Sequence, residues 1–155
     1  MDISWESVIG HEVNKKRLQT LLAEDRMPHA LLFCGPEGTG KRRLAGVLAA
    51  ALLCSSVKGR PCGHCDSCRS MQADTHPDFY LVEPESRGKS ARSIRIEQIR
   101  AMETEIARVL ILAARRVVLI DEAELMNEAA ANSLLKTLEE PSGQTVFILV
   151  TSARS

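Results

Sequence analysis

Short apolar runs alternate along this chain with longer stretches in which apolar residues return every three or four positions. The short runs predict buried strands at 29–35, 78–84, 116–122 and 145–151. The longer stretches predict helices over 12–24, from Lys41 to Leu52, over 96–109 and over 128–140. Because strands alternate with helices, the pattern predicts an α/β fold whose parallel sheet is covered by helices on both faces.

The ends of these elements carry local signals of their own. Asn127 is a suitable N-cap for the last helix, and Pro141 is expected to stop that helix. The helix that Lys41 opens is expected to be amphipathic. Cys34, in the first strand, is expected to act as a small buried hydrophobic residue. His29 and His76 are expected to be structural rather than catalytic.

Composition narrows the class of protein. The 155 residues suit one domain, and a hydrophobic content of 45% argues against disorder. Twenty basic and twenty acidic residues cancel, so any attraction to nucleic acid or to an anionic membrane must come from a local patch. We find no apolar run long enough to cross a bilayer and no signal peptide in the first residues, so we expect a cytoplasmic protein without a membrane partner.

The stretch GPEGTGKR, residues 35–42, follows the first predicted strand and opens a helix. This G-x-x-x-x-G-K pattern is typical of a phosphate-binding loop, in which backbone N–H groups and the helix N-terminus face the phosphates. The expected nucleotide-binding residues of this loop are Gly35, Gly38, Thr39, Gly40, Lys41 and Arg42. The alternative is an ordinary glycine turn.

An acidic pair, Asp121 and Glu122, follows the third predicted strand. In this fold class such a pair lies beside the phosphate loop, where the aspartate would hold Mg²⁺ through water and the glutamate would polarise the attacking water. These two residues are therefore the candidate catalytic pair, in a site that has lost one of its usual parts. The alternative is that the two carboxylates only begin a solvated loop.

Arg42 stands where such loops carry the Ser or Thr hydroxyl that binds Mg²⁺. A guanidinium has no lone pair to offer a cation, so one metal ligand is missing. Thr39 leaves the loop from a different position and is not expected to replace that ligand. We expect a site that can bind ATP or ADP with little dependence on Mg²⁺ and with slow or absent hydrolysis. The alternative is that Arg42 points to solvent while water completes the metal shell.

Four of the five cysteines are clustered at Cys54, Cys62, Cys65 and Cys68. Two C-x-x-C steps share one cysteine, and this spacing predicts a tetrahedral, structural zinc site in a small module at 54–68. His64 is a rival ligand, but it lies inside one of the steps and is expected to face solvent.

Basic residues gather in the polar segment 86–92 and its surroundings, including Arg87, Lys89, Arg92 and Arg95. They could contact DNA phosphates, although a solvated surface is the simpler interpretation. The few aromatic residues do not support recognition of single strands by base stacking.

Taken together, these motifs resemble the bacterial clamp-loader subunits of DNA polymerase III, which are AAA+ proteins. The resemblance rests on VIGHEVNKKRLQTLL, MPHALLFCGPEGTGK, the cysteine module, ADTHPDFYLVEPE, VVLIDEAELMNEAAANSLLKTLEEP and FILVTS. It covers essentially the whole chain but only the first domain of the family. ADTHPDFY and DEAELMNEAAANSLLKTLEEP are more similar to the delta prime branch than to the gamma/tau motor branch.

The resemblance implies an AAA+ nucleotide-binding domain at 1–155 in a five-membered loader, with delta and gamma/tau subunits as partners. The sliding clamp and primed DNA would be reached through that complex. It also implies that Val8, Ile9 and Gly10 help line the adenine pocket and that Thr151 is a polar sensor of the terminal phosphate. The arginine-finger motif of the family is absent from the ending TSARS.

The resemblance further implies the sheet order five, one, four, three, two. We therefore expect the chain to stop before the fifth strand and the lid, which would leave the first strand as an exposed edge open to self-association. Three functions stay open at this point: a stabilising clamp-loader subunit, the ATP-hydrolysing gamma/tau motor, and a zinc-dependent DNA-binding module with a vestigial nucleotide fold.

Overall fold

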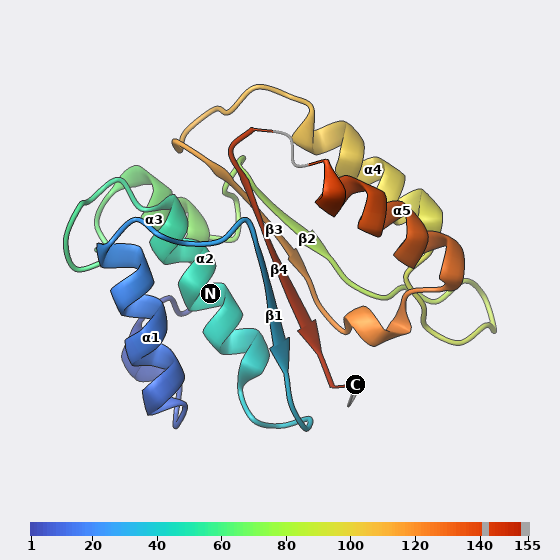
Figure 1. The fold of residues 1–155 in the computed structure, drawn as a ribbon, viewed down its shortest axis with the longest axis horizontal. Coiled ribbons are helices and arrows are strands. Elements are labelled where there is room, and N and C mark those ends of the chain that lie inside the picture. Colours follow the sequence, from blue (N-terminus) through green and yellow to red (C-terminus); the bar gives the residue numbers. More distant parts are fainter. Residues whose placement is uncertain (141–142, 153–155) are drawn as a thin grey trace.

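All four predicted strands are present in the computed structural model, which describes residues 1–140 and 143–152. They are β1 (Ala30–Cys34), β2 (Phe79–Val82), β3 (Arg116–Ile120) and β4 (Thr145–Thr151). They form one parallel sheet in the order β1-β4-β3-β2 (Figure 1). The predicted fold class is confirmed, and the order agrees with four of the five strand positions that the family resemblance implies.

Helices cover both faces of this sheet (Figure 1). One face carries α1 (Glu12–Ala23), α2 (Lys41–Leu53) and α3 (Asp66–Gln72), and the other carries α4 (Ile96–Ile106) and α5 (Glu128–Glu139). Two short 3₁₀ turns, η1 (Trp5–Ser7) and η2 (Ala123–Leu125), complete the elements of the described residues. None of these helices is long and apolar enough to cross a membrane.

Strand β3 shows why the central apolar runs are continuous rather than alternating. Val117 and Leu119 pack into the core under α2, whereas Val118 and Ile120 pack into the core under α4 and α5. All of β3 is buried because both of its faces are covered. Its carboxyl end therefore delivers Asp121 and Glu122 to the same edge of the sheet as the end of β1.

Helix α2 is more deeply buried than an amphipathic helix. All of its residues except Arg42 and Arg43 are buried, so the prediction of an amphipathic helix was wrong. The reason is that α2 is enclosed, with the sheet on one side and η1, α1 and α3 packed around the rest. Its first turn is consequently held in a fixed position.

Strand β1 is less buried than its sequence suggests. Leu32 is 59% exposed and Cys34 is also exposed, so the prediction of a buried Cys34 was wrong. Within the described residues β1 pairs only with β4, and one of its edges is therefore uncovered. Self-association through this edge stays a prediction.

The ends of the last two helices depend on specific polar contacts. Asn127 caps α5 as predicted, with its Oδ1 accepting the backbone N–H of Ala130 at 2.9 Å. Helix α4 ends at Ile106, earlier than predicted, and Val109 is 83% exposed. At the end of α4, the buried guanidinium of Arg116 donates hydrogen bonds to the carbonyls of Ile106 and Arg108. Pro141 lies outside the described residues.

Candidate functional site

The glycine loop joins β1 to α2 in a conformation that requires glycine. Gly38 and Gly40 have φ angles of 78° and 80°, in the left-handed region that other residues rarely occupy. Gly40 is also the N-cap of α2 and offers no side-chain cap, so the first N–H groups of the helix stay available to an anion. The loop forms one wall of an open groove of about 400 Å³ lined by Glu37, Gly38, Thr39, Gly40, Lys41, Arg42, Arg92, Asp121, Glu122, Val150 and Ser152.

The side chain of Lys41 lies under the glycine loop and is 8% exposed. Its Nζ donates to the carbonyl oxygens of Gly35 and Pro36, at 2.7 and 2.6 Å. Thr39 Oγ1 donates to the Pro36 carbonyl at 3.0 Å, which agrees with the expectation that it does not replace the missing hydroxyl. The loop is therefore shaped around its own lysine.

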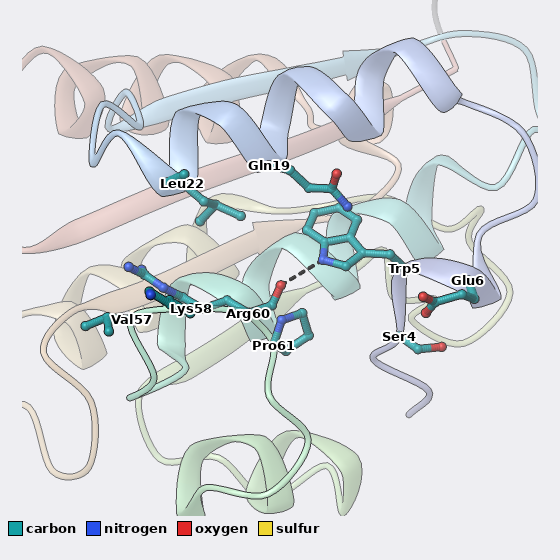
Figure 2. A pocket seen from close by; sticks show the side chains of 11 residues that line it. Ser4, Trp5, Glu6, Gln19, Leu22, Val57, Lys58, Arg60 and Pro61 are labelled. Carbon is teal, nitrogen blue, oxygen red and sulfur yellow. Dashed lines mark hydrogen bonds between the residues drawn. The ribbon is translucent and has the colours of Figure 1, made fainter.

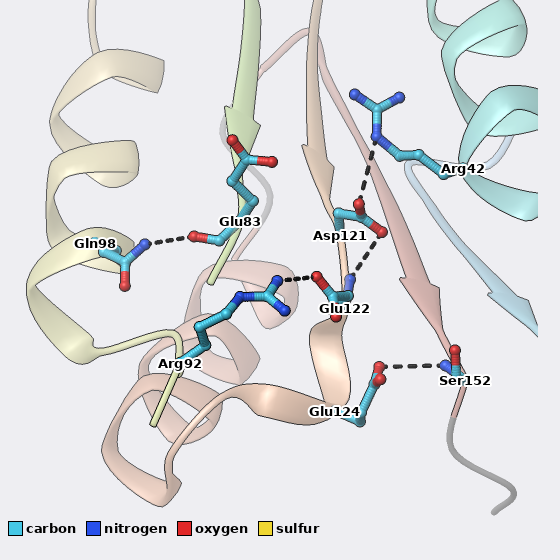
Figure 3. A network of polar contacts seen from close by, with 8 residues as sticks. All are labelled: Arg42, Glu83, Arg92, Gln98, Asp121, Glu122, Glu124 and Ser152. Carbon is cyan, nitrogen blue, oxygen red and sulfur yellow. Dashed lines mark hydrogen bonds and ion pairs between the residues drawn. The ribbon is translucent and has the colours of Figure 1, made fainter. Parts of the chain in front are cut away.

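Arg42 turns toward the acidic pair. Its Nε lies 3.6 Å from Oδ2 of Asp121, while the other carboxylate oxygen of Asp121 accepts the backbone N–H of Glu122 at 2.9 Å (Figure 3). The alternative in which Arg42 points to solvent was therefore wrong. The structure brings the glycine loop and the acidic pair together, with an arginine between them.

Glu122 is paired with a residue that the sequence did not single out for this site. Arg92 Nη2 forms an ion pair with Glu122 Oε2, so each acidic side chain of the pair faces an arginine (Figure 3). The segment before α4 is held in place by backbone bonds between Glu85 and Ser93 and by bonds from Ile94 to the η2 region. No local sequence signal predicts this contact, because it depends on how that segment packs.

Thr151 lies at the end of β4, buried and beside η2. Its side chain hydrogen-bonds Glu124, and Glu124 Oε1 also accepts the backbone N–H of Ser152 at 3.2 Å. Burial raises the pKa of Glu124, but a bond from its own backbone N–H, the bonds from Ser152 and Thr151 and the charge of Lys41 outweigh burial and lower the pKa. Glu124 is thus a further acidic residue near the groove that sequence reasoning missed.

The structure does not place Val8, Ile9 and Gly10 in this groove. They line a separate hollow of about 600 Å³ with α1, where Val8 is buried and Ile9 is 91% exposed. The next residue, His11, contacts the carbonyl of Thr39 through Nε2 and so connects this segment to the glycine loop. His11 was not predicted as a site residue.

The four clustered cysteines converge on one point. The Sγ atoms of Cys54, Cys62, Cys65 and Cys68 all lie within 4.8 Å of one another. Two of the separations, Cys62–Cys68 and Cys54–Cys65, are 3.9 Å. Four sulfurs at about 2.3 Å from a tetrahedral ion would be about 3.8 Å apart, so this cluster could hold a metal ion.

Backbone N–H groups surround these sulfurs, as is usual for thiolate ligands. Cys54 Sγ accepts from Ser56 and Cys62, and Cys62 Sγ accepts from His64 and Cys65. The side chain of His64 is exposed, in agreement with its predicted place outside the ligand set. Burial raises the pKa of the Cys54 and Cys68 thiols, so a cation is needed to keep these groups as thiolates at neutral pH.

The cysteine segment is tied to the N-terminal turn by the indole of Trp5. Its Nε1 donates to the carbonyl of Arg60 at 2.8 Å, across a hollow of about 540 Å³ (Figure 2). Arg60 belongs to the stretch between Cys54 and Cys62, and Trp5 is three residues before Val8. The packing of Trp5 therefore depends on the fold of the cysteine segment.

Comparisons with known proteins bear on this arrangement of glycine loop, acidic pair and cysteine cluster. A family model described as DNA polymerase III, delta subunit, matches residues 10–155. DNA polymerase III subunit delta′ of Pseudomonas aeruginosa is 46% identical over 123 residues, which is 79% of this chain and 37% of that protein. This chain belongs to the delta prime family of DNA polymerase III subunits.

Other relatives agree with the delta prime assignment. Subunit delta′ of Bacillus subtilis is 35% identical over 154 residues, 97% of this chain and 45% of that protein. Subunit tau of the same organism is 32% identical over 149 residues, 96% of this chain and 25% of that protein. The chain spans less than half the length of these curated relatives. Identity is higher with the delta′ proteins, as the sequence motifs predicted.

Solved structures support the fold alone, because their sequence identity is low. The RuvB Holliday junction branch migration motor of Thermotoga maritima has a TM-score of 0.55 at 20% identity, covering 97% of this chain and 41% of its own. The DNA clamp loader delta protein of Bacillus subtilis has a TM-score of 0.58 at 12% identity, covering 90% of this chain and 36% of its own.

Proposed function

We propose that this delta prime chain serves in the clamp loader of DNA polymerase III as a supporting subunit that does not drive the loader by ATP hydrolysis. Membership of the delta prime family is the evidence that the chain serves in the clamp loader. The Arg42–Asp121 ion pair is the evidence for a role without ATP hydrolysis. A hydrolytic site needs its acidic pair for the metal and the attacking water, and here both members face arginines. This ion-pair arrangement is the observation that carries the proposal.

The groove itself is proposed to bind ATP or ADP at the glycine loop. Gly35, Gly38, Thr39, Gly40 and Lys41 would meet the phosphates, with Thr151 as a sensor at the end of β4. Asp121 and Glu122 keep the positions of a catalytic pair but are not expected to support brisk turnover. The base would lie toward Val8, Ile9 and Gly10, to which His11 connects the loop.

The remaining parts fit one AAA+ domain over residues 1–155 with a structural zinc module at 54–68. Four sulfur ligands leave no open coordination position, so the metal would support the fold and take no part in chemistry. We place the protein in the cytoplasm, where bacterial DNA is replicated. The proposed partners are the delta and gamma/tau subunits, and through the assembled loader the sliding clamp and primed DNA.

The gamma/tau motor is the less supported alternative. Two observations argue against it: the sequence identity to tau proteins is lower than to delta′ proteins, and an arginine stands at position 42. The third hypothesis, a zinc-dependent DNA-binding module, gains no support from membership of the delta prime family.

Reconstitution tests the proposed membership in the loader. The purified protein, mixed with purified delta and tau subunits, is expected to form a stable complex on a sizing column. That complex should place the sliding clamp on primed DNA, and omission of this protein should abolish loading. A loader that assembles and loads equally well without it would contradict the proposal, as would a failure to associate with either subunit.

A further inference from the structure

The acidic pair in the groove is not available to a magnesium ion in the usual way. Mg²⁺ requires near-octahedral oxygen ligands at about 2.0–2.1 Å. Arg42 offers no such oxygen, and Asp121 has one carboxylate oxygen facing that guanidinium and the other accepting a backbone N–H. Glu122 is occupied by Arg92. The residues present therefore do not fit the metal that nucleotide sites of this type hold.

The two arginines also change the charge of the groove. Its lining includes three basic side chains and three acidic ones, so the formal charge is zero. Without Arg42 and Arg92 that formal charge would be −2, which would repel a polyphosphate. The two guanidinium groups thus add the same amount of positive charge that one Mg²⁺ ion would bring.

Both arginines remain within reach of a ligand. The side chains of Arg42 and Arg92 are 35% and 53% exposed, and both line the groove beside the glycine loop. They come from opposite sides of the acidic pair, one from α2 and one from the segment before α4 (Figure 3). A guanidinium can bind phosphate oxygens through two parallel N–H donors, which a solvated lysine does less well.

We infer that Arg42 and Arg92 replace Mg²⁺ in this groove, so that it takes a nucleoside polyphosphate in its metal-free form. The inference rests on the nucleotide site proposed above and adds the form of ligand that this site selects. On binding, each guanidinium would exchange a carboxylate for phosphate oxygens, while Lys41 would exchange two carbonyls of the loop for the phosphates. Added Mg²⁺ would compete by binding the same phosphate oxygens in solution.

Calorimetric titration with ATP, once in excess EDTA and once in excess Mg²⁺, tests this inference. We expect saturable binding in EDTA that is at least as tight as in Mg²⁺. Arg42→Thr and Arg92→Ala should each weaken binding in EDTA by about tenfold, which is the usual effect of losing one charge-assisted bond. Arg42→Thr should also make binding depend on Mg²⁺, because the hydroxyl restores a metal ligand.

Matched variants separate the specific effect from general changes of charge or fold. Arg43→Thr and Arg87→Ala remove exposed arginines outside the groove lining and should leave both affinities unchanged. Arg42→Lys keeps the charge and should retain most of the binding in EDTA. Thermal melting of each variant shows whether it has folded.

Three results would overturn the inference: binding that requires Mg²⁺, no saturable binding under either condition, or an Arg42→Thr variant that binds ATP in EDTA as the parent does. Assembly with delta and tau is measured separately, by the reconstitution described above. A protein that joins the loader but binds only Mg²⁺–ATP would therefore refute the metal-free site while leaving the proposed function in place.

Discussion

Stripping the proposed zinc ion from the four-cysteine cluster is expected to unfold the segment from Cys54 to α3 and to expose Trp5. Apparent binding free energies of structural zinc sites are about 10–16 kcal/mol, so this loss should exceed that of any single core truncation. The sulfur of Cys65 caps α3, and Cys68 is fully buried, so both the helix and its packing depend on the cluster. Without a cation the clustered sulfurs would repel one another as thiolates or take up protons and become neutral thiols.

Tryptophan fluorescence measures the exposure of Trp5 directly, because Trp5 is the only tryptophan of the chain. Its indole N–H donates to the carbonyl of Arg60, in the segment between Cys54 and Cys62 (Figure 2). We expect a strong chelator or Cys68→Ser to shift the emission to the red and to increase quenching by acrylamide, with release of one zinc ion per chain. Cys34→Ser, which lies outside the cluster, should change neither. A metal-free purified protein with an unchanged spectrum would contradict this.

Asp78→Ala is expected to be the most damaging single substitution outside the cysteine cluster. The carboxylate is fully buried and accepts the backbone N–H groups of Ile111, Leu112 and Ala113 at 2.9, 2.7 and 2.7 Å. Its removal leaves these donors without their partner, so we expect a loss of about 3–5 kcal/mol in the free energy of unfolding. Urea denaturation measures this loss, and Glu97→Ala, on the exposed face of α4, should cost under about 0.5 kcal/mol.

The same region predicts how stability depends on pH. Burial raises the pKa of Asp78, but the three N–H donors and His76 outweigh it and hold the pKa below 3.8. Its stabilisation is present above pH 3.8 and is lost as pH falls through the lower pKa of the folded state. Burial also lowers the pKa of His76 below 6.5, so stability should begin to fall as pH drops below that value. Equal stability at pH 7 and pH 4, or a harmless Asp78→Ala, would contradict this account.

His76 illustrates why that pH effect is structural. Its Nδ1 accepts the backbone N–H of Asp78 at 3.0 Å, and its Nε2 lies 3.0 Å from Ser67 Oγ. Both ring nitrogens are used inside the core, as the sequence led us to expect of a non-catalytic histidine. Protonation would disturb these contacts without touching the groove.

The features that the sequence predicted are those encoded locally. Each strand contains a single apolar run, Asn127 caps the helix that directly follows it, and the glycines at 38 and 40 shape a turn of only a few residues. The cysteine cluster was predicted because the C-x-x-C steps fix the short distances between sulfurs. Such signals need no knowledge of the rest of the chain.

The features that the sequence did not predict arise from packing between distant segments. Arg92 reaches Glu122 only because the segment before α4 is bonded to the η2 region. Cys34 is exposed because its strand lies at an edge of the described sheet. Helix α4 ends early because Arg116, from the next strand, donates to the carbonyl of its last residue, Ile106, and to that of Arg108 beyond it. A local pattern contains no information on these contacts.

The central claim is that this delta prime chain keeps the shape of a nucleotide site without its hydrolytic activity. The most direct test is ATP turnover by the purified protein with Mg²⁺, compared with its Glu122→Gln variant, in which the candidate water-polarising carboxylate is neutralised. We predict that the two rates are the same and no higher than the background without protein. A brisk rate that Glu122→Gln abolishes would show a working motor site and would contradict the account.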